Sequence, residues 1–260
     1  MFMDISKPLD GNFLNWAYFI FIRYWPLFFN GIKITLVIAL SGTVIGLLIG
    51  LFIGGLRAIK ISNSDTLVVR WSKKLLYLIT SFYVEIFRGT PMMVQSMFIY
   101  YSLKPIFQWS PLVAGIFIVS INTGAYMAEI IRAGIQSVAI GQSEAALSLG
   151  MTPWQSMINI IFPQAIRNAF PAIGNEFVVN IKDSSVLNVI SVTEVYFQAR
   201  SAAGTYYKFT ESFFVAACIY FVLTFTTTRI LAIVEKHLDV DSKVVGSQTV
   251  THAIMKGGDK

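Results

Sequence analysis

A stretch of the chain without charge, Ile34 to Leu56, constrains the fold more than any other feature. At about 1.5 Å of rise per residue, a helix of this length crosses the roughly 30 Å hydrocarbon core of a bilayer. Other long apolar stretches occupy about 75–103, 111–131, 170–197 and 212–234. Only 13% of the 260 residues are charged, which is about half the share in an ordinary soluble domain. We therefore expect an all-α polytopic membrane protein with about five transmembrane helices, surrounded by membrane lipid.

Small residues form a stripe along the charge-free stretch. Glycine recurs at every fourth position, at Gly42, Gly46, Gly50 and Gly54. Such a stripe lets another helix backbone approach closely, so this span is predicted to pack inside a bundle. The segment before it, Trp16 to Asn30, is aromatic-rich and is expected to be broken by Pro26. This pattern is typical of an interfacial helix that leads into the span, rather than of another span. We divide the chain into an N-terminal interfacial segment (1–27), a transmembrane domain (28–236) and a cytoplasmic C-terminal tail (237–260).

Basic residues are concentrated between the first two spans. They are Arg57, Lys60, Arg70, Lys73 and Lys74. Because cytoplasmic loops carry the excess of Lys and Arg, this segment is predicted to be cytoplasmic. Alternation then places the N-terminus outside, and the 132–167 loop and the C-terminus inside. An excess of Lys and Arg in the cytoplasmic loops accounts for the net charge of +6, so we expect no nucleic-acid partner.

The cytoplasmic loop has the sequence pattern of two short helices joined at a glycine. Gln142 to Leu149 contains good helix formers, and Gly150 can adopt the left-handed conformation that ends such a helix. Thr152 and Gln155 have the spacing of a capping box, which begins the second helix. Pro163 is predicted to end it. Two short helices at the membrane surface would form a docking knob.

The same loop resembles the signature of binding-protein-dependent ABC import permeases. The residues that match its spacing are Glu144, Ala145, Ala146, Gly150, Ile160 and Pro163. One position departs from the signature, because Phe162 stands where leucine is usual. The resemblance implies that the 141–163 loop is a coupling helix, which docks in a groove of an ATPase subunit.

Three further stretches resemble the permeases for polar amino acids, of the histidine, glutamine and arginine type. They are residues 87–91, 125–135 and 182–185, and the whole resemblance covers about 28–236. It implies a type I ABC importer permease fold in the cell membrane of a prokaryote. The implied partners are two copies of an ATP-binding ABC subunit, a second permease subunit (identical or homologous) and an extracytoplasmic amino-acid-binding protein. Transport would proceed by alternating access.

The chain lacks the motifs of a nucleotide-binding or metal-dependent enzyme. No Gly-Lys pair occurs, so there is no phosphate-binding loop, and no metal-ligand spacing is present. We therefore expect no catalytic residue and no cofactor in this chain, with ATP and Mg bound by the partner ATPase.

Charged and polar side chains within the spans are the candidates for substrate contacts, because such groups are costly in a membrane. A zwitterionic amino acid needs a cation for its carboxylate, which Arg88 could supply, and an anion for its ammonium, for which Asp183 is the best candidate. The predicted substrate-binding residues are Arg88, Glu129, Asn180, Asp183, Ser184 and Ser185. Alternatively, Glu85–Arg88 and Glu129–Arg132 are ion pairs that contact no substrate.

Three questions stay open at the level of sequence. Residues 180–188 could form a break in the helix, where freed backbone groups would line the path. A related ABC importer for another small solute is the main alternative function. An ion-coupled secondary transporter is a more distant one, because such proteins usually show paired repeats and more spans.

Overall fold

The computed structural model describes residues 7–8, 11–59 and 65–256, with side chains as far as residue 237. Every regular element in these ranges is helical. The elements are α1 (Phe13–Arg57), α2 (Leu67–Gly89), α3 (Met92–Phe107), α4 (Pro111–Ser137), α5 (Ile140–Ser148), α6 (Pro153–Ser156), the π-helix η1 (Met157–Ile161), α7 (Phe162–Asp183), the 3-10 helix η2 (Ser184–Ile190), α8 (Val195–Tyr206) and α9 (Phe209–Lys256). The predicted all-α fold is confirmed.

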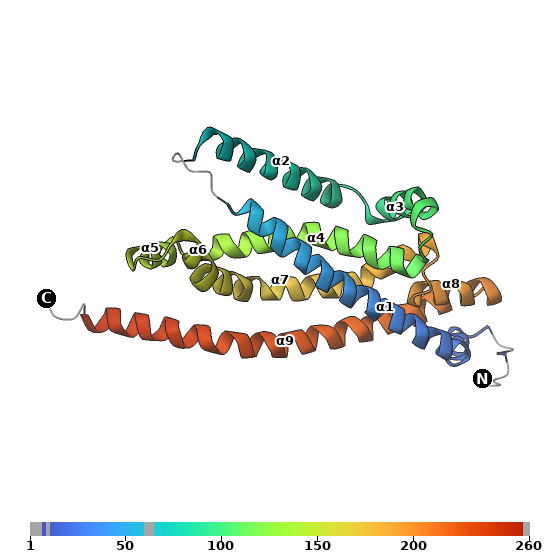
Figure 1. Cartoon of the computed structure of the whole chain (residues 1–260). Coiled ribbons are helices and arrows are strands. Elements are labelled where there is room, and N and C mark those ends of the chain that lie inside the picture. The colour runs from blue at the N-terminus through green and yellow to red at the C-terminus, as the bar shows by residue number, and fades with distance from the viewer. Residues whose placement is uncertain (1–6, 9–10, 60–64, 257–260) are drawn as a thin grey trace.

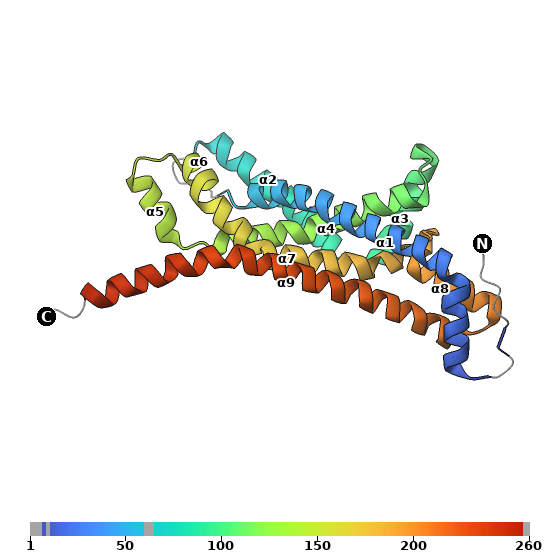
Figure 2. The same cartoon turned by 90° about the horizontal axis from the view of Figure 1, so that it is seen from below.

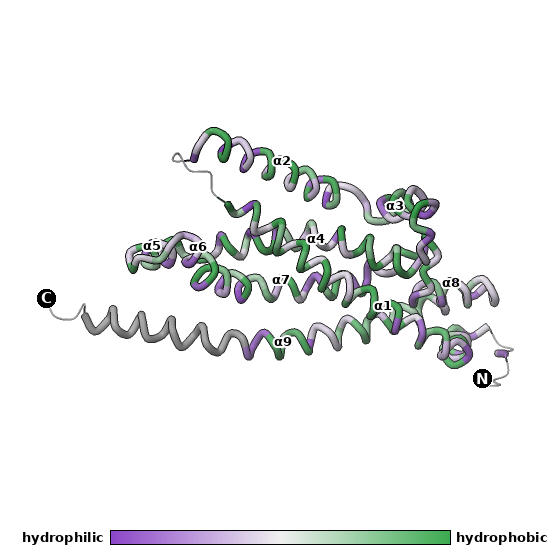
Figure 3. The backbone as a smooth tube through the Cα atoms, in the orientation of Figure 1, coloured by the Kyte–Doolittle hydropathy of each residue, from purple (hydrophilic) through white to green (hydrophobic). Residues whose placement is uncertain are grey.

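The long helices form an elongated bundle (Figures 1 and 2). Three of them are long and apolar enough to cross a membrane: α1, α4 and residues Phe209–His237 of α9. The hydrophobic residues are dense along α1 and the described part of α9 (Figure 3). Helices α2 and α7, with 23 and 22 residues, extend in the same general direction but carry more charge. The α5–α6 knob lies at one end of the bundle, and α3 and α8 lie at the other.

The glycine stripe of α1 packs against α4, as a close helix contact requires. A Cβ atom added at Gly46 would lie 2.9 Å from the Thr123 Cβ atom, and one added at Gly54 would lie 2.7 Å from the Ala128 carbonyl oxygen. Only glycine leaves room for such an approach. The predicted packing of this span is confirmed, and α1 with α4 forms the centre of the bundle.

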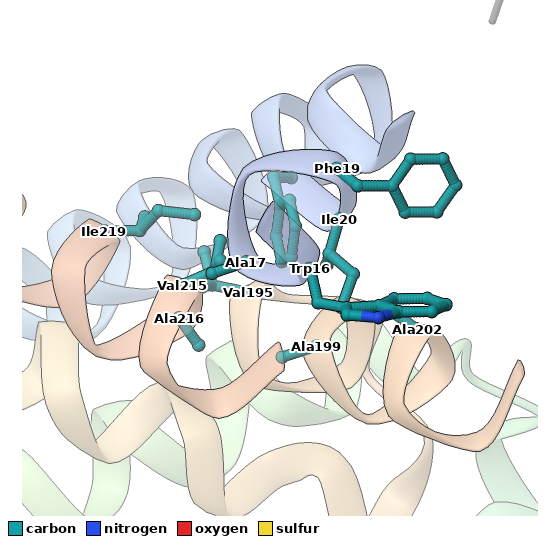
Figure 4. Close-up of a cluster of buried hydrophobic side chains, with 11 residues drawn as sticks. Trp16, Ala17, Phe19, Ile20, Val195, Ala199, Ala202, Val215, Ala216 and Ile219 are labelled. Atoms are coloured by element: carbon teal, nitrogen blue, oxygen red, sulfur yellow. The ribbon is translucent and has the colours of Figure 1, made fainter. Parts of the chain in front are cut away.

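The N-terminal part of α1 differs from the prediction. The helix does not end before the span but continues through Pro26, and Figure 2 shows that its first turns lie at a steep angle to the rest. A proline removes one donor and bends the helix axis, and a membrane helix tolerates it where neighbouring groups satisfy the freed backbone. Trp16, Phe19 and Ile20 are buried against α8 and α9, where they form a hydrophobic cluster (Figure 4). This segment therefore packs against the bundle.

Two prolines have different effects in the middle of the chain. At Thr90–Pro91 the helix stops and restarts, so α2 and α3 are separate helices, and the second hydrophobic region is interrupted as predicted. The prediction that Pro163 ends a helix is wrong, because Pro163 is the second residue of α7. The helix accommodates it by passing through the π-helical turn η1, in which Phe162 N–H bonds the Met157 carbonyl. The knob is therefore continuous with α7.

The break that the sequence left open at residues 180–188 is present. Helix α7 ends at Asp183, η2 follows as a 3-10 turn, and the chain then reverses through Ser191, which has a φ of 66°. Helix α8 is a separate element after this turn. Glu194 begins it by accepting hydrogen bonds from the Tyr196 N–H (2.9 Å) and the Phe197 N–H (2.8 Å).

Candidate functional site

Charged side chains from two helices come together beside α4. Arg88 lies in the last turn of α2, and its guanidinium carbon is 5.4 Å from the centre of the Tyr126 ring of α4. Glu176 of α7 interacts electrostatically with both Arg88 and Asp183. Glu176 and Asp183 are seven residues apart, two helical turns, and so face the same side of α7. The two strongest sequence candidates, Arg88 and Asp183, thus each interact with Glu176.

This group of residues has the chemistry for a zwitterion. Arg88 is exposed at the end of its helix, so its planar fork is open to a carboxylate. Asp183 and Glu176 are partly buried and supply carboxylates for an ammonium group. The ring of Tyr126 holds the guanidinium through a cation–π contact. Glu85 and Arg88 form no ion pair among the described residues. The alternative role of Arg88, as the partner of Glu85 in an ion pair, is therefore not observed.

Asn180 lies in the bundle interior and connects three helices. Its side chain is 3% exposed. The amide nitrogen donates to Thr43 Oγ1 of α1 at 2.9 Å, and the amide oxygen accepts from Thr123 Oγ1 of α4 at 2.9 Å. Both polar atoms of the amide are used by the protein. A substrate contact for Asn180 stays a prediction, and its observed bonds are those of a helix clamp.

Glu129 forms an ion triad at the knob end of the bundle. Its carboxylate accepts from Arg132 Nη2 at 2.7 Å and forms an ion pair with Arg57, the last residue of α1. The Arg57 guanidinium also lies 5.5 Å from the centre of the Tyr77 ring of α2. The triad therefore ties α1, α2 and α4 together. The predicted Glu129–Arg132 ion pair is present, whereas a substrate contact for Glu129 stays a prediction.

The two serines after Asp183 differ in exposure. Ser184 is fully buried and donates to the Ile181 carbonyl at 2.9 Å, while Ser185 is partly exposed. Ser185 is thus the better placed of the two for a ligand. A separate pocket of about 430 Å³ lies beside the N-terminal half of α1, next to Lys33 and Gln198. None of the predicted substrate residues lines it.

The knob has the turn that its sequence predicts. Gly150 has a φ of 83°, and the N–H groups of Gly150 and Met151 bond the carbonyls of Leu147 (3.0 Å) and Ala146 (3.2 Å). This pair of bonds is a Schellman motif, which needs the left-handed residue that glycine supplies. Thr152 and Gln155 form the predicted capping box.

The knob also exposes apolar side chains. Leu149 is 84% exposed and Trp154 is 72% exposed, while Ile140 and Leu147 are exposed beside them. Of the signature residues, Glu144, Ala145, Gly150 and Pro163 are exposed, and Ala146 is buried against the rest of the knob. An exposed apolar patch on a small protrusion is typical of a protein-docking surface.

Three residues of this neighbourhood were not among the sequence candidates. Tyr126 and Glu176 lie on polar stripes of their helices, which was the signal that could have selected them. Gln95 is buried and bonds the backbone at the α2–α3 break.

Comparison with known proteins identifies the family. A family model described as "Binding-protein-dependent transport system inner membrane component" matches residues 66–240. The chain belongs to this family. It is 35% identical over 222 residues to a putative glutamine transport system permease protein of Rickettsia felis, covering 85% of this chain and 98% of that protein. It is 36% identical over 215 residues to the arginine transport system permease protein of Bacillus subtilis, covering 82% and 93%.

Solved structures of related permeases agree with this fold. The crystal structure of an amino acid ABC transporter with histidines contains a chain that is 38% identical, with a TM-score of 0.75 over 88% of this chain and 100% of that one. An inward-facing methionine ABC transporter superposes with a TM-score of 0.63 at 19% identity, covering 80% and 96%, which supports the fold alone. This permease is therefore a type I ABC importer membrane subunit.

Proposed function

We propose that this permease imports a polar amino acid, and that Arg88 and Asp183 lie on the path of the substrate. The observation that carries the proposal is the interaction of the Arg88 guanidinium of α2 with the Glu176 carboxylate of α7, which also interacts with Asp183. A free amino acid presents a carboxylate and an ammonium group, and this arrangement has a partner for each. Glutamine and arginine, which name the transport systems of the relatives, and the histidines of the related transporter structure belong to the same substrate class.

The energy for transport would come from a separate ATPase subunit that docks on the knob. The exposed Leu149 and Trp154 supply apolar contact area, and Glu144 lies on the same short helix, α5. The knob continues through η1 into α7, which ends at Asp183. A movement of the ATPase would thus be passed directly to the substrate path, as alternating access requires.

The proposed assembly follows from the family. It comprises two permease subunits, two ATPase subunits that bind ATP and Mg, and an extracytoplasmic binding protein that delivers the amino acid. The knob lies at the same end of the bundle as the last turn of α1 and the first turns of α2. We assign this end to the cytoplasm because these turns carry Arg57, Arg70, Lys73 and Lys74. The N-terminus would then lie outside.

The test is uptake in proteoliposomes that contain the permease, its ATPase and its binding protein, with a panel of labelled amino acids. We expect ATP-dependent uptake of one polar class. Asp183→Asn and Arg88→Ala should each lower uptake about tenfold or more, because hydrogen bonds to charged groups contribute about 1.5–3 kcal/mol. ATP hydrolysis by the complex serves as the control for assembly.

Two outcomes would contradict the proposal at different levels. Normal uptake by both variants would move the substrate path away from α2 and α7. Absence of uptake for every amino acid, with intact ATP hydrolysis, would favour another small solute.

A further inference from the structure

The break between α2 and α3 leaves backbone oxygens without helical donors. In a continuous helix the Phe87 carbonyl would accept from the N–H of residue 91, but that residue is Pro91 and has no N–H. The backbone changes direction at Thr90, which is extended with a ψ of 146°. Inside a membrane protein an unsatisfied carbonyl costs several kcal/mol, so another donor is required at this point.

Two side-chain amides supply the missing donors. Gln95 Nε2 lies 3.0 Å from the Phe87 oxygen and 2.9 Å from the Thr90 oxygen. Asn122 Nδ2 of α4 lies 3.2 Å from the Phe87 oxygen. The two amides also bond each other, with Asn122 Nδ2 donating to Gln95 Oε1 at 2.9 Å. Gln95 and Asn122 are 7% and 8% exposed, so water cannot readily replace them.

This amide pair bonds the backbone next to Arg88. Phe87, whose carbonyl both amides bond, is the neighbour of Arg88 in the chain. Asn122 and Tyr126 are four residues apart on α4 and share a face. Two contacts therefore come from one face of α4. Asn122 bonds the Phe87 carbonyl, and Tyr126 contacts the Arg88 guanidinium.

We propose that Gln95 and Asn122 are positioning residues, which fix the α2–α3 break and thereby hold the Arg88 guanidinium against Tyr126. They contact the backbone and not the substrate. The claim that Arg88 then serves transport rests on the proposed function, whereas the claim that the amide pair holds the last turn of α2 does not.

The first test measures the mobility of that turn. In a Cys218→Ser background, a nitroxide label is attached at Arg88→Cys, and its spectrum is recorded in the assembled complex. Asn122→Ala and Gln95→Met should each raise the mobile fraction about threefold, as expected for loss of an interhelical hydrogen bond of average strength in a membrane protein. A label at Ile79→Cys, which is exposed more than two turns earlier on α2, should not respond.

The matched control is Asn180→Ala. Asn180 is also buried and also bonds across helices, but it bonds Thr43 and Thr123 rather than the break. We expect no change at position 88 in this variant. Unchanged mobility in the Asn122 and Gln95 variants, or an equal rise with Asn180→Ala, would overturn the proposal. If Asn122→Ala does not assemble, Gln95→Met decides alone.

The second test asks whether Asn122 acts through Arg88. Uptake is measured for Asn122→Ala, Arg88→Ala and the double variant. If Asn122 only positions Arg88, the double variant should lose no more uptake than Arg88→Ala alone, whereas independent structural damage would multiply the two losses. Full uptake by Arg88→Ala would refute the proposed role of Arg88 in transport, and the label experiment would still decide whether the amide pair holds the turn.

Discussion

Polar side chains in this bundle divide into those that are satisfied by protein and those that are open. Asn180, Asn122, Gln95 and Glu129 have their polar atoms in bonds between helices. Arg88, Asp183 and Ser185 retain exposure. Burying a polar group is costly unless it is hydrogen-bonded or paired, and each residue of the first set is bonded to another polar group of the protein. The second set has no such explanation and is the better guide to transport.

Removal of the charge on Glu129 should destabilise the complex. In Glu129→Gln the Arg57 side chain, which is 9% exposed, would lose its carboxylate partner. An uncompensated buried charge of this kind lowers Tm by roughly 5–10 °C in a protein of this size. The measurement is thermal unfolding of the purified complex. Glu85→Gln is the control, because Glu85 is exposed on α2, and an equal fall in both variants would contradict the role of the triad.

At the scale of elements, the close contact between α1 and α4 depends on α1 having no side chains along one face. A Cβ atom at Gly50 would lie 2.7 Å from the backbone carbon of Met127 and 2.9 Å from the Ala128 nitrogen. Backbone atoms cannot rotate away as a side chain can. The α1–α4 pair therefore sets the spacing from which the other helices are arranged.

Alanine in this contact should separate the two helices. We expect Gly50→Ala to lower the yield and Tm of the assembled complex, although alanine is favoured over glycine in a helix by about 1 kcal/mol. Gly55→Ala is a matched control on the same helix, since a Cβ atom there meets nothing within 4 Å. Size-exclusion chromatography of both variants gives the comparison. Equal behaviour would show that the contact is looser than described.

The elements that the sequence could predict are those set by local rules. Gly150, Thr152 and Gln155 define the knob through turn and capping chemistry, whereas the polar residues before and after Asp183 only indicated where a break could occur. The continuation of α1 through Pro26 and of α7 through Pro163 could not be predicted, because each depends on tertiary packing or on a π-helical turn. The bonds of Asn180 to Thr43 and Thr123 also required the arrangement of three helices.

At the scale of the whole molecule, the knob is the part on which we propose that the ATPase docks. Its shape depends on Gly150, whose φ of 83° costs an alanine about 1–2 kcal/mol. A Cβ atom there would meet nothing within 4 Å, so the cost is conformational and not steric crowding. The membrane helices do not depend on this turn.

Gly150→Ala should therefore weaken coupling without preventing membrane insertion. We expect less ATPase subunit to co-purify and less amino acid to be transported per ATP hydrolysed. Gly141→Ala is the control, because Gly141 lies in α5, has no positive φ and has equally open space. Co-purification and uptake are measured on the same preparations. Loss of the permease from the membrane would assign Gly150 to folding instead.

The continuity of the chain from α6 through η1 into α7 has a mechanical consequence. A flexible loop between a docking site and a membrane helix would absorb small displacements, whereas an uninterrupted rod transmits them. Helix α7 alone has 22 residues, or about 33 Å, and its far end carries Asp183. If the proposed function is correct, α6, η1 and α7 form a lever arm, which would carry a displacement of the ATPase at the knob to the proposed substrate path at Asp183.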